Sequence, residues 1–402
     1  VKNIYVQNCD ETLSKDTEIE NGTLKIIGAK LTAEGDFETL EEDVVMTEAA
    51  LLVEGKMGEF ASRVCSNTSD IMIKKKTRMS SGTFIFSGQC TFECKQNVEI
   101  NGGGFYSSQG FVQCVINGDF VQNGHVSIKE GEIHFKGDYI FNGYKWKRGD
   151  YIEYGKKCRV CFCGDRVQKV STKDHDGVYW GQLDFSRSKG VCIQDILVGY
   201  SLDGVDKIKS EKETLSLYMD IIHMDKDTVV EGDLELQNSR LEINEGSLHI
   251  KVLGYKVRIE SEKNILIDGN VEGGRELEIL LMGKSPERKK FEVGGEFNAT
   301  SGYLTEIGNT EIRLQGNVNI KGSFSIGSRN GNSGEWKSEV YINRDLNFYS
   351  GGSFFGDGTV YLKGDYYQKY TKQGDSVFNG NFVFAPNKNG THKIEADCKE
   401  TI

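Results

Sequence analysis

Two short runs in this sequence have residue types that could do chemistry. Asp174-His175-Asp176 sets two carboxylates around an imidazole, a combination that binds metals or moves protons. Cys158, Cys161 and Cys163 could ligate zinc through their thiolates. Consecutive strand residues point in different directions, however, and no second Cys/His pair lies at zinc-finger spacing. We therefore expect a solvated loop tip at 174–176 and a packing ladder at the cysteines, and we assign no catalytic or metal-binding residue.

Glycine-rich turns are a second place where a cofactor could bind. Asn101-Gly102-Gly103-Gly104 is not followed by the Lys-Ser/Thr pair that a phosphate-binding loop requires. Gly-Asp pairs recur, but not in the tight tandem of the calcium-binding nonapeptide, and the Asp becomes Asn or Glu along the chain. An Asp or Asn that bonds the backbone of its own turn explains that exchange. We expect structural corners here and no cofactor.

Aromatic residues are the one feature with a potential for recognition. Six of them gather in one stretch: Tyr144, Trp146, Tyr151, Tyr154, Tyr179 and Trp180. Flat aromatic faces with polar rims suit sugar rings and protein partners alike. We predict that these residues form an exposed recognition surface. The alternative is that they cap the open end of a coil.

The elements that position these residues are set by one repeated phrase: a turn glycine, a small polar residue and an apolar residue. Examples are Gly118-Asp119-Phe120, Gly137-Asp138-Tyr139, Gly295-Glu296-Phe297, Gly316-Asn317-Val318 and Gly364-Asp365-Tyr366. Neighbouring copies lie about 20 residues apart, which is one turn of a coil with two or three short strands. A propeller blade would need about twice that length. The sequence predicts an all-β fold, a parallel β-solenoid, with a right-handed β-helix as the favoured form.

Short runs that alternate apolar and polar residues supply the strands of this coil. They include 83–86, 98–100, 111–116, 125–128 and 132–135. Each run is too short to form a stable hairpin alone, so each must stack on the equivalent strand of the next turn. The segment 205–223 fits either a short amphipathic helix or an edge strand.

Composition excludes several classes of protein. The net charge of −11 over 402 residues disfavours nucleic acid as a partner. No run of about 18 apolar residues occurs, so we expect no membrane span in this segment. Ten cysteines are spaced too irregularly for a disulfide framework, which favours packed thiols. The chain starts at Val1 without a signal peptide, which suggests a processed chain or part of a longer one.

The sequence also contains a second internal repeat with a longer period. Lys15-Asp16-Thr17 is matched by Lys226-Asp227-Thr228, and Lys136-Gly137-Asp138-Tyr139 by Lys363-Gly364-Asp365-Tyr366. We predict two imperfect solenoid modules, 1–212, with an irregular stretch at 144–197, and 213–402, which is truncated at its C-terminal end.

The order of these motifs carries a resemblance to a known kind of protein. The chain resembles a tandem module of large secreted or surface proteins of Firmicutes. The resemblance rests on the order Lys-Asp-Thr, strands of alternating apolar and polar residues, Lys-Gly-Asp-Tyr and then Gly390-Thr391-His392-Lys393-Ile394. More loosely, it is similar to the β-helical shafts of filamentous-haemagglutinin-type adhesins. The resemblance implies a stiff bacterial stalk, extracellular or on the cell surface, whose partners are the parent chain or neighbouring modules. The first copy departs from it with Lys156-Lys157-Cys158-Arg159-Val160.

Three functions stay open at this level. The first is a structural or adhesive segment without enzymatic activity, which binds a carbohydrate or a host or cell-surface protein through its lateral surface and exposed aromatics. The second is a carbohydrate-active β-helix, a polysaccharide lyase or glycosidase, which needs paired carboxylates, or Asp with Lys or Arg, on adjacent rungs. The third is a receptor-binding module like a phage tail spike, which would be trimeric.

Overall fold

The computed structural model describes residues 3–396 with gaps, and all regular structure in the described part is β-strand. The gaps are 21, 41–42, 61–62, 143–151, 173–177, 195–196, 205–206, 225–227, 238–239, 244–247, 252–255, 262–264, 268, 273–275, 284–287, 309, 323, 329–338, 350–352, 356–358, 369–380 and 386–389. Among the described residues, no helix is long and apolar enough to cross a membrane. Contacts divide the chain into two compact units, 1–202 (unit 1) and 203–402 (unit 2).

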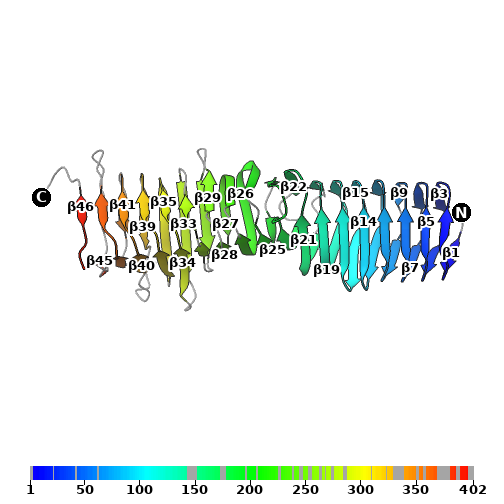
Figure 1. The fold of residues 1–402 in the computed structure, drawn as a ribbon, viewed down its shortest axis with the longest axis horizontal. Helices are drawn as coiled ribbons and strands as arrows, with labels where there is room; N and C mark the ends of the chain where they lie inside the picture. The colour runs from blue at the N-terminus through cyan, green and yellow to red at the C-terminus, as the bar shows by residue number, and fades with distance from the viewer. Residues whose placement is uncertain are drawn as a thin grey trace. The chain divides into compact units, whose positions relative to one another are not determined.

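Unit 1 is a coil whose strands form three parallel columns (Figure 1). The first column holds β1 (Ile4–Gln7), β4 (Leu24–Ile27), β7 (Asp43–Thr47), β10 (Arg63–Asn67), β13 (Thr83–Ser87), β16 (Gly104–Gln109), β19 (His125–Phe135), β21 (Ile152–Phe162), β23 (Val178–Asp184) and β25 (Leu197–Asp203). The second holds β2 (Glu11–Leu13), β5 (Lys30–Ala33), β8 (Ala50–Val53), β11 (Asp70–Ile73), β14 (Cys90–Cys94) and β17 (Val112–Ile116), and joins the long strand β19. The third holds β3 (Thr17–Glu20), β6 (Phe37–Leu40), β9 (Met57–Phe60), β12 (Thr77–Met79), β15 (Val98–Ile100), β18 (Phe120–Gln122), β20 (Tyr139–Phe141), β22 (Gln168–Thr172) and β24 (Val191–Ile193).

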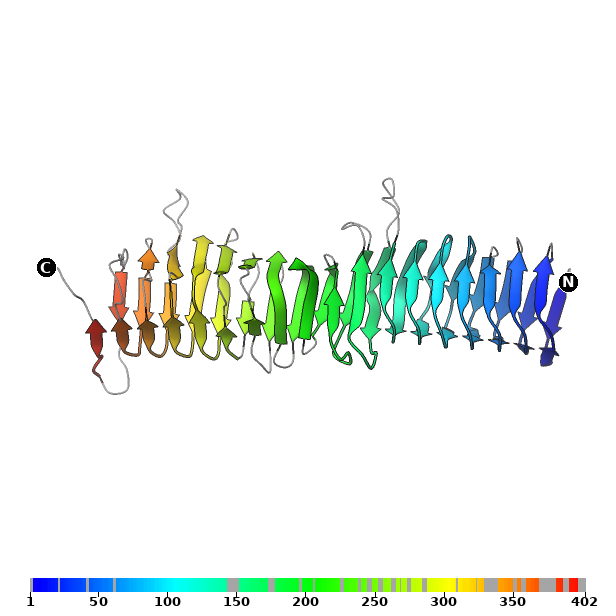
Figure 2. The ribbon, with the colours of Figure 1, turned by 90° about the horizontal axis from the view of Figure 1, so that it is seen from above.

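Unit 2 is built in the same way, as Figure 2 shows for its successive strands. β26 (Lys207–Met224) pairs with β27 (Thr228–Gln237) and β28 (Arg240–Ile243). One column runs from β27 through β30 (Lys256–Ser261), β33 (Glu276–Gly283), β36 (Gly302–Gly308), β39 (Phe324–Ser328) and β42 (Ser353–Phe355). Another runs from β28 through β31 (Ile265–Ile267), β34 (Lys289–Val293), β37 (Thr310–Leu314), β40 (Glu339–Ile342), β43 (Thr359–Leu362) and β45 (Asn381–Phe384). The last holds β29 (Leu248–Lys251), β32 (Val271–Glu272), β35 (Phe297–Ala299), β38 (Val318–Ile320), β41 (Leu346–Phe348), β44 (Tyr366–Gln368) and β46 (Ile394–Ala396).

The pairing is parallel and joins equivalent residues of successive turns. Ile4 pairs with Leu24, and Leu24 pairs with Val44. The predicted all-β parallel solenoid is therefore confirmed, whereas its right-handedness stays a prediction. The segment 205–223, which the sequence left open between helix and strand, lies mostly in β26.

The chain divides close to the predicted module boundary, and the stretch 144–197 takes part in the coil. Units 1–202 and 203–402 divide the chain near the predicted modules 1–212 and 213–402, and the internal repeat itself stays a prediction. Described parts of 144–197 form β21 to β24 and pair with the preceding turns. Register shifts interrupt the pairing of β21 on both sides, so the coil is locally uneven there.

The core of each described coil is a narrow stack of apolar side chains. Along β13 the inward residues Phe84 and Phe86 are fully buried, while Ile85 between them is half-buried. Phe105 of the next turn stacks on Phe84 with ring centroids 5.0 Å apart. Alternation of side chains along a strand sets this pattern, and parallel stacking repeats it from turn to turn.

A polar ladder runs along the corner that carries the repeated phrase. Oδ1 of Asp16 accepts a hydrogen bond from the backbone N–H of Asp36 at 2.8 Å, and Oδ1 of Asp36 accepts one from the N–H of Lys56 at 2.8 Å. The same bond recurs from Asp138 to Asp119, Lys169 to Asp138, Asp365 to Asp345 and Lys393 to Asp365. The side chain thus bonds the next turn and not its own, which corrects the interpretation drawn from the sequence. Asn can replace Asp because its amide oxygen accepts the same bond.

The glycine of the phrase is required by the close approach of two turns. A Cβ on Gly137 would lie 2.4 Å from the carbonyl carbon of Gly118, and a Cβ on Gly316 would lie 2.2 Å from the carbonyl oxygen of Gly295. Neither position has room for a side chain, and neither has a positive φ.

We expect Asp36→Ala to lower the free energy of unfolding by about 1 kcal/mol, because the N–H of Lys56 loses its acceptor. Asp36→Asn is the matched control, since Asn270 accepts the equivalent bond from the N–H of Glu296 at 2.6 Å. Urea unfolding followed by circular dichroism measures both variants. Equal losses of stability in the two would contradict the ladder.

Candidate functional sites on the outer faces

The structure describes three of the six aromatic residues that were predicted to form a recognition surface. Tyr144, Trp146 and Tyr151 lie outside the described residues. Tyr179 lies half-buried on the outward side of β23. Tyr154 and Trp180 lie inside the coil, 1% and 0% exposed, with their rings stacked at a centroid distance of 5.1 Å.

The expected exposure of Tyr154 and Trp180 is corrected by this placement. Alternation along β23 turns Trp180 inward, next to the outward Tyr179. There Tyr139 packs edge-on against it, with ring centroids 5.0 Å apart. The hydroxyl of Tyr139 donates a 2.8 Å hydrogen bond to Oε1 of the buried Gln122. These rings fill the core of unit 1 and are not available to a partner.

Of the two runs whose residue types could do chemistry, only the cysteine run lies among the described residues. Asp174-His175-Asp176 lies outside the described residues. Cys158 is buried in the interior of the coil, whereas Cys161 and Cys163 are on the opposite, outward side of the same chain segment. The packing role expected for Cys158 fits its position, but Cys161 has a different environment.

Cys161 lies between residues of the preceding and the following turn. In the pairing of β19 with β21, His134 is opposite Cys161, and in the pairing of β21 with β23, Cys161 is opposite Asp184. Nε2 of His134 is 3.1 Å from Oε1 of Glu132, and Sγ of Cys161 is 3.9 Å from the same oxygen. One ligand atom from each of Glu132, His134 and Cys161 lies within 4.8 Å of the others. We call these three residues the Glu-His-Cys cluster.

The charge of Asp184 borders this cluster. Its Oδ1 accepts hydrogen bonds from the N–H and hydroxyl of Ser186 at 2.8 and 2.6 Å, and its Oδ2 accepts one from Arg159 at 2.6 Å. Burial favours the neutral acid, but these bonds outweigh it and lower the pKa of Asp184. Burial, followed by the charge of Asp184, raises the pKa of the Cys161 thiol to about 12.

No sequence pattern indicates the Glu-His-Cys cluster. The cysteine run was visible, but Glu132 and His134 are a whole turn away, and His134 and Cys161 are 27 residues apart (134 to 161) and not about 20. Only the observed register brings them together.

A second polar network lies on the outward side of β37 and β40 in unit 2. Glu311 and Glu339 are opposite each other in neighbouring turns. The guanidinium of Arg288 bridges both carboxylates, 3.2 Å from Glu311 and bonded to Glu339, and Arg313 bonds Glu311. The bond from Arg288 is the main cause that lowers the pKa of Glu339. Because guanidinium groups bond both carboxylates, this pair is arranged as an ion-pair network.

Two tyrosines extend this network along the two following turns. The rings of Tyr341 and Tyr361 stack, with centroids 4.9 Å apart and planes 11° apart. The guanidinium of Arg313 lies 5.1 Å from the ring centroid of Tyr341, whose hydroxyl donates a 2.8 Å hydrogen bond to Glu339. Both tyrosines are half-buried. We call Arg313, Tyr341 and Tyr361 the aromatic column.

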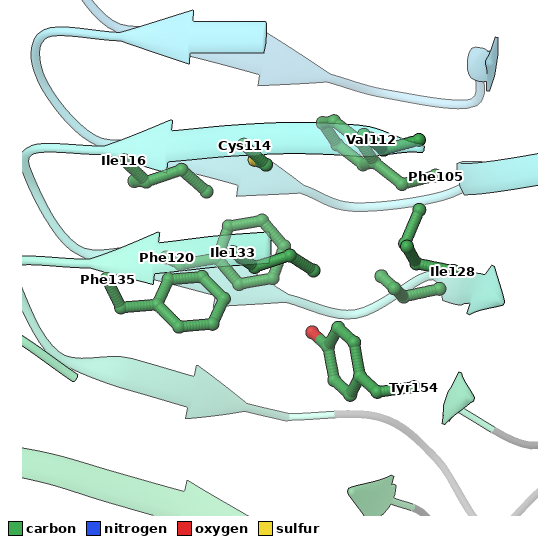
Figure 3. A pocket seen from close by; sticks show the side chains of 10 residues that line it. Phe105, Val112, Cys114, Ile116, Phe120, Ile128, Ile133, Phe135 and Tyr154 are labelled. Carbon is green, nitrogen blue, oxygen red and sulfur yellow. The ribbon is translucent and has the colours of Figure 1, made fainter. Parts of the chain in front are cut away.

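A small cavity lies in the core of unit 1, and Figure 3 shows its lining. It has a volume of about 20 Å³, and its walls are Phe105, Val112, Cys114, Ile116, Phe120, Val126, Ile128, Ile133, Phe135 and Tyr154. A water molecule needs two to four polar partners, which these walls do not supply. We interpret the cavity as a packing void.

Comparisons of the chain with protein-family models, with curated proteins and with solved structures found no match. The fold class rests on the strand pairing itself. The resemblance to surface modules of Firmicutes and to haemagglutinin-type shafts stays a prediction.

We expect Trp180→Ala to lower the free energy of unfolding by roughly 3–5 kcal/mol, since it leaves a large cavity in a filled core. Tyr179→Ala is the matched control, because the neighbouring side chain points outward and its loss costs much less. Chemical unfolding monitored by circular dichroism compares the two. A larger loss for Tyr179→Ala would contradict the inward placement of Trp180.

Proposed function

We propose that this chain is a structural or adhesive β-helical segment of a larger secreted or cell-surface protein. The observation that carries the proposal is the stacking of equivalent side chains from turn to turn on the outer faces. This arrangement supports both parts of the proposal, mechanical continuity and a repeated lateral surface.

Mechanical continuity is supported by hydrogen bonds that link each turn to the next at several positions around the coil. Besides the backbone ladder and the corner ladder, an asparagine ladder joins three successive turns of unit 2. Nδ2 of Asn319 donates to Oδ1 of Asn298 at 2.7 Å, and Nδ2 of Asn347 donates to Oδ1 of Asn319 at 2.8 Å. Separation of two turns breaks all of these bonds together, which suits a stalk.

The adhesive part is supported by the aromatic column. Tyr341 and Tyr361 present stacked rings beside the charged rim of Arg313 and Glu339. Arg313 and Tyr361 cover the two faces of Tyr341, so a sugar would contact the ring edges and hydrogen-bond to the hydroxyls and charged groups of this column. We therefore propose a carbohydrate of a cell surface as the ligand of this column, and neighbouring modules of a parent chain as its structural partners.

The enzymatic alternative finds its paired carboxylates in Glu311 and Glu339, which occupy adjacent turns. Arg288 binds both of them, and the lowered pKa of Glu339 leaves it ionised, which favours binding over acid catalysis. The tail-spike-like alternative would use the same lateral surface in a trimer.

We expect the purified chain to bind glycans on an array, and Tyr341→Ala combined with Tyr361→Ala to weaken that binding at least about tenfold, which corresponds to about 1.4 kcal/mol. Tyr179→Ala, an outward tyrosine of unit 1, is the control and should bind like the parent chain.

Two results would overturn this proposal. Glycan binding that is unchanged in the double tyrosine variant would remove the adhesive role from the aromatic column. Release of sugar products from polysaccharides, abolished by Glu311→Gln, would establish the enzymatic alternative. The molecular mass measured by light scattering in solution distinguishes the tail-spike alternative from the other two, because that alternative requires a trimer.

A further inference from the structure

We propose that the Glu-His-Cys cluster, Glu132, His134 and Cys161, binds one zinc ion on the outward side of unit 1. This inference does not depend on the proposed function, because the cluster lies on β19 and β21 and shares no residue with the aromatic column.

The spacing of the three groups already approaches that of a zinc site. Zinc binds carboxylate oxygen and imidazole nitrogen at about 2.0–2.2 Å and thiolate sulfur at about 2.3 Å. In a tetrahedron these lengths set the ligand atoms about 3.3–3.6 Å apart. The observed separations are 3.1 Å between Nε2 of His134 and Oε1 of Glu132, and 3.9 Å between that oxygen and Sγ of Cys161. Small side-chain rotations suffice to place a metal between them.

The neighbouring groups hold these ligands in orientation. Sγ of Cys163 lies 3.8 Å from Nδ1 of His134, so the histidine presents its other nitrogen, Nε2, to Glu132. Oδ2 of Asp184 lies 3.8 Å from Sγ of Cys161 and accepts a hydrogen bond from Arg159, while Ser186 holds the other oxygen of that carboxylate. Groups behind the ligands commonly fix the ring and tune the affinity of metal sites.

The scaffold beneath the cluster is rigid. Glu132 and His134 are two residues apart on β19 and so point to the same side, and Cys161 is opposite His134 on the paired strand β21. The interleaved residues Ile133, Val160 and Phe162 are buried in the core and anchor both strands. Sites on paired strands hold their geometry better than sites on loops.

Burial and ligand chemistry both indicate zinc. Cys161 is 1% exposed, while the side chains of His134 and Glu132 are 13% and 34% exposed, so the cluster opens to solvent on the glutamate side. A water molecule can complete the coordination there, as in zinc sites with three protein ligands. Thiolate and imidazole are poor ligands for Ca²⁺ and Mg²⁺, which prefer oxygen.

Cobalt(II) is the probe for the test, since it enters zinc sites and its thiolate complexes absorb light. We expect the reduced, metal-free chain to bind one equivalent of Co²⁺ with a thiolate-to-cobalt absorption band, and Zn²⁺ to displace it. Cys161→Ser and His134→Ala should each abolish the band and weaken Zn²⁺ binding at least about tenfold. Cys65→Ser is the control, because Cys65 is a half-buried cysteine at an outward position of β10 and lies outside the cluster, so this variant should keep both.

Glu132→Gln guards against loss of folding, because it keeps the shape of the side chain and removes only its charge. Its circular dichroism should match the parent chain while its Zn²⁺ affinity falls about tenfold or more. Absence of the cobalt band in the reduced parent chain would overturn the proposal. Persistence of the band in Cys161→Ser, or its loss in Cys65→Ser, would place the metal elsewhere and overturn it as well.

Discussion

Each described feature of this protein depends on one constraint, the parallel pairing of equivalent residues one turn apart. Because the backbone of each turn lies on that of the turn before, whatever occupies a position meets its own equivalent. Apolar positions then form a continuous core, in which Phe105 stacks on Phe84. Polar side chains form hydrogen bonds with the neighbouring turn, as Asp36 accepts one from the N–H of Lys56.

The same constraint builds the candidate sites. Groups that could do little alone gain partners from the neighbouring turn, as Cys161 gains His134 and Tyr341 gains Tyr361. In neither case do the partners come from a motif in the chain. A lateral surface of this kind can change its chemistry by changing residues within one or two turns, while the core and the corner ladder stay as they are.

The fold could be predicted from the sequence because one corner of the coil tolerates few residue types. Gly137 has no room for a Cβ, and Asp138 must supply an acceptor, so the phrase recurs and its spacing gives the turn. A second corner could not be recognised in the sequence. Its residue has a positive φ, and this position is filled by Asn8, Glu48 and Thr68 as well as by glycine. Tyr154 and Trp180 were misplaced because aromatic residues in an irregular stretch give no indication of which side faces inward. The Glu-His-Cys cluster depends on a register that the sequence does not contain.

Cross-linking between turns tests the pairing most directly. Val45 on β7 is opposite the native Cys65 on β10, and both are half-buried on the outward side. Val45→Cys should therefore form a disulfide with Cys65 on mild oxidation, because paired residues lie within the Cα separation of about 4.4–6.8 Å that a disulfide spans. Thr47→Cys, which is opposite Asn67, should not react with Cys65. A disulfide found by mass spectrometry only in Val45→Cys is the predicted result, and its absence there, or equal cross-linking in both variants, would contradict the in-register coil.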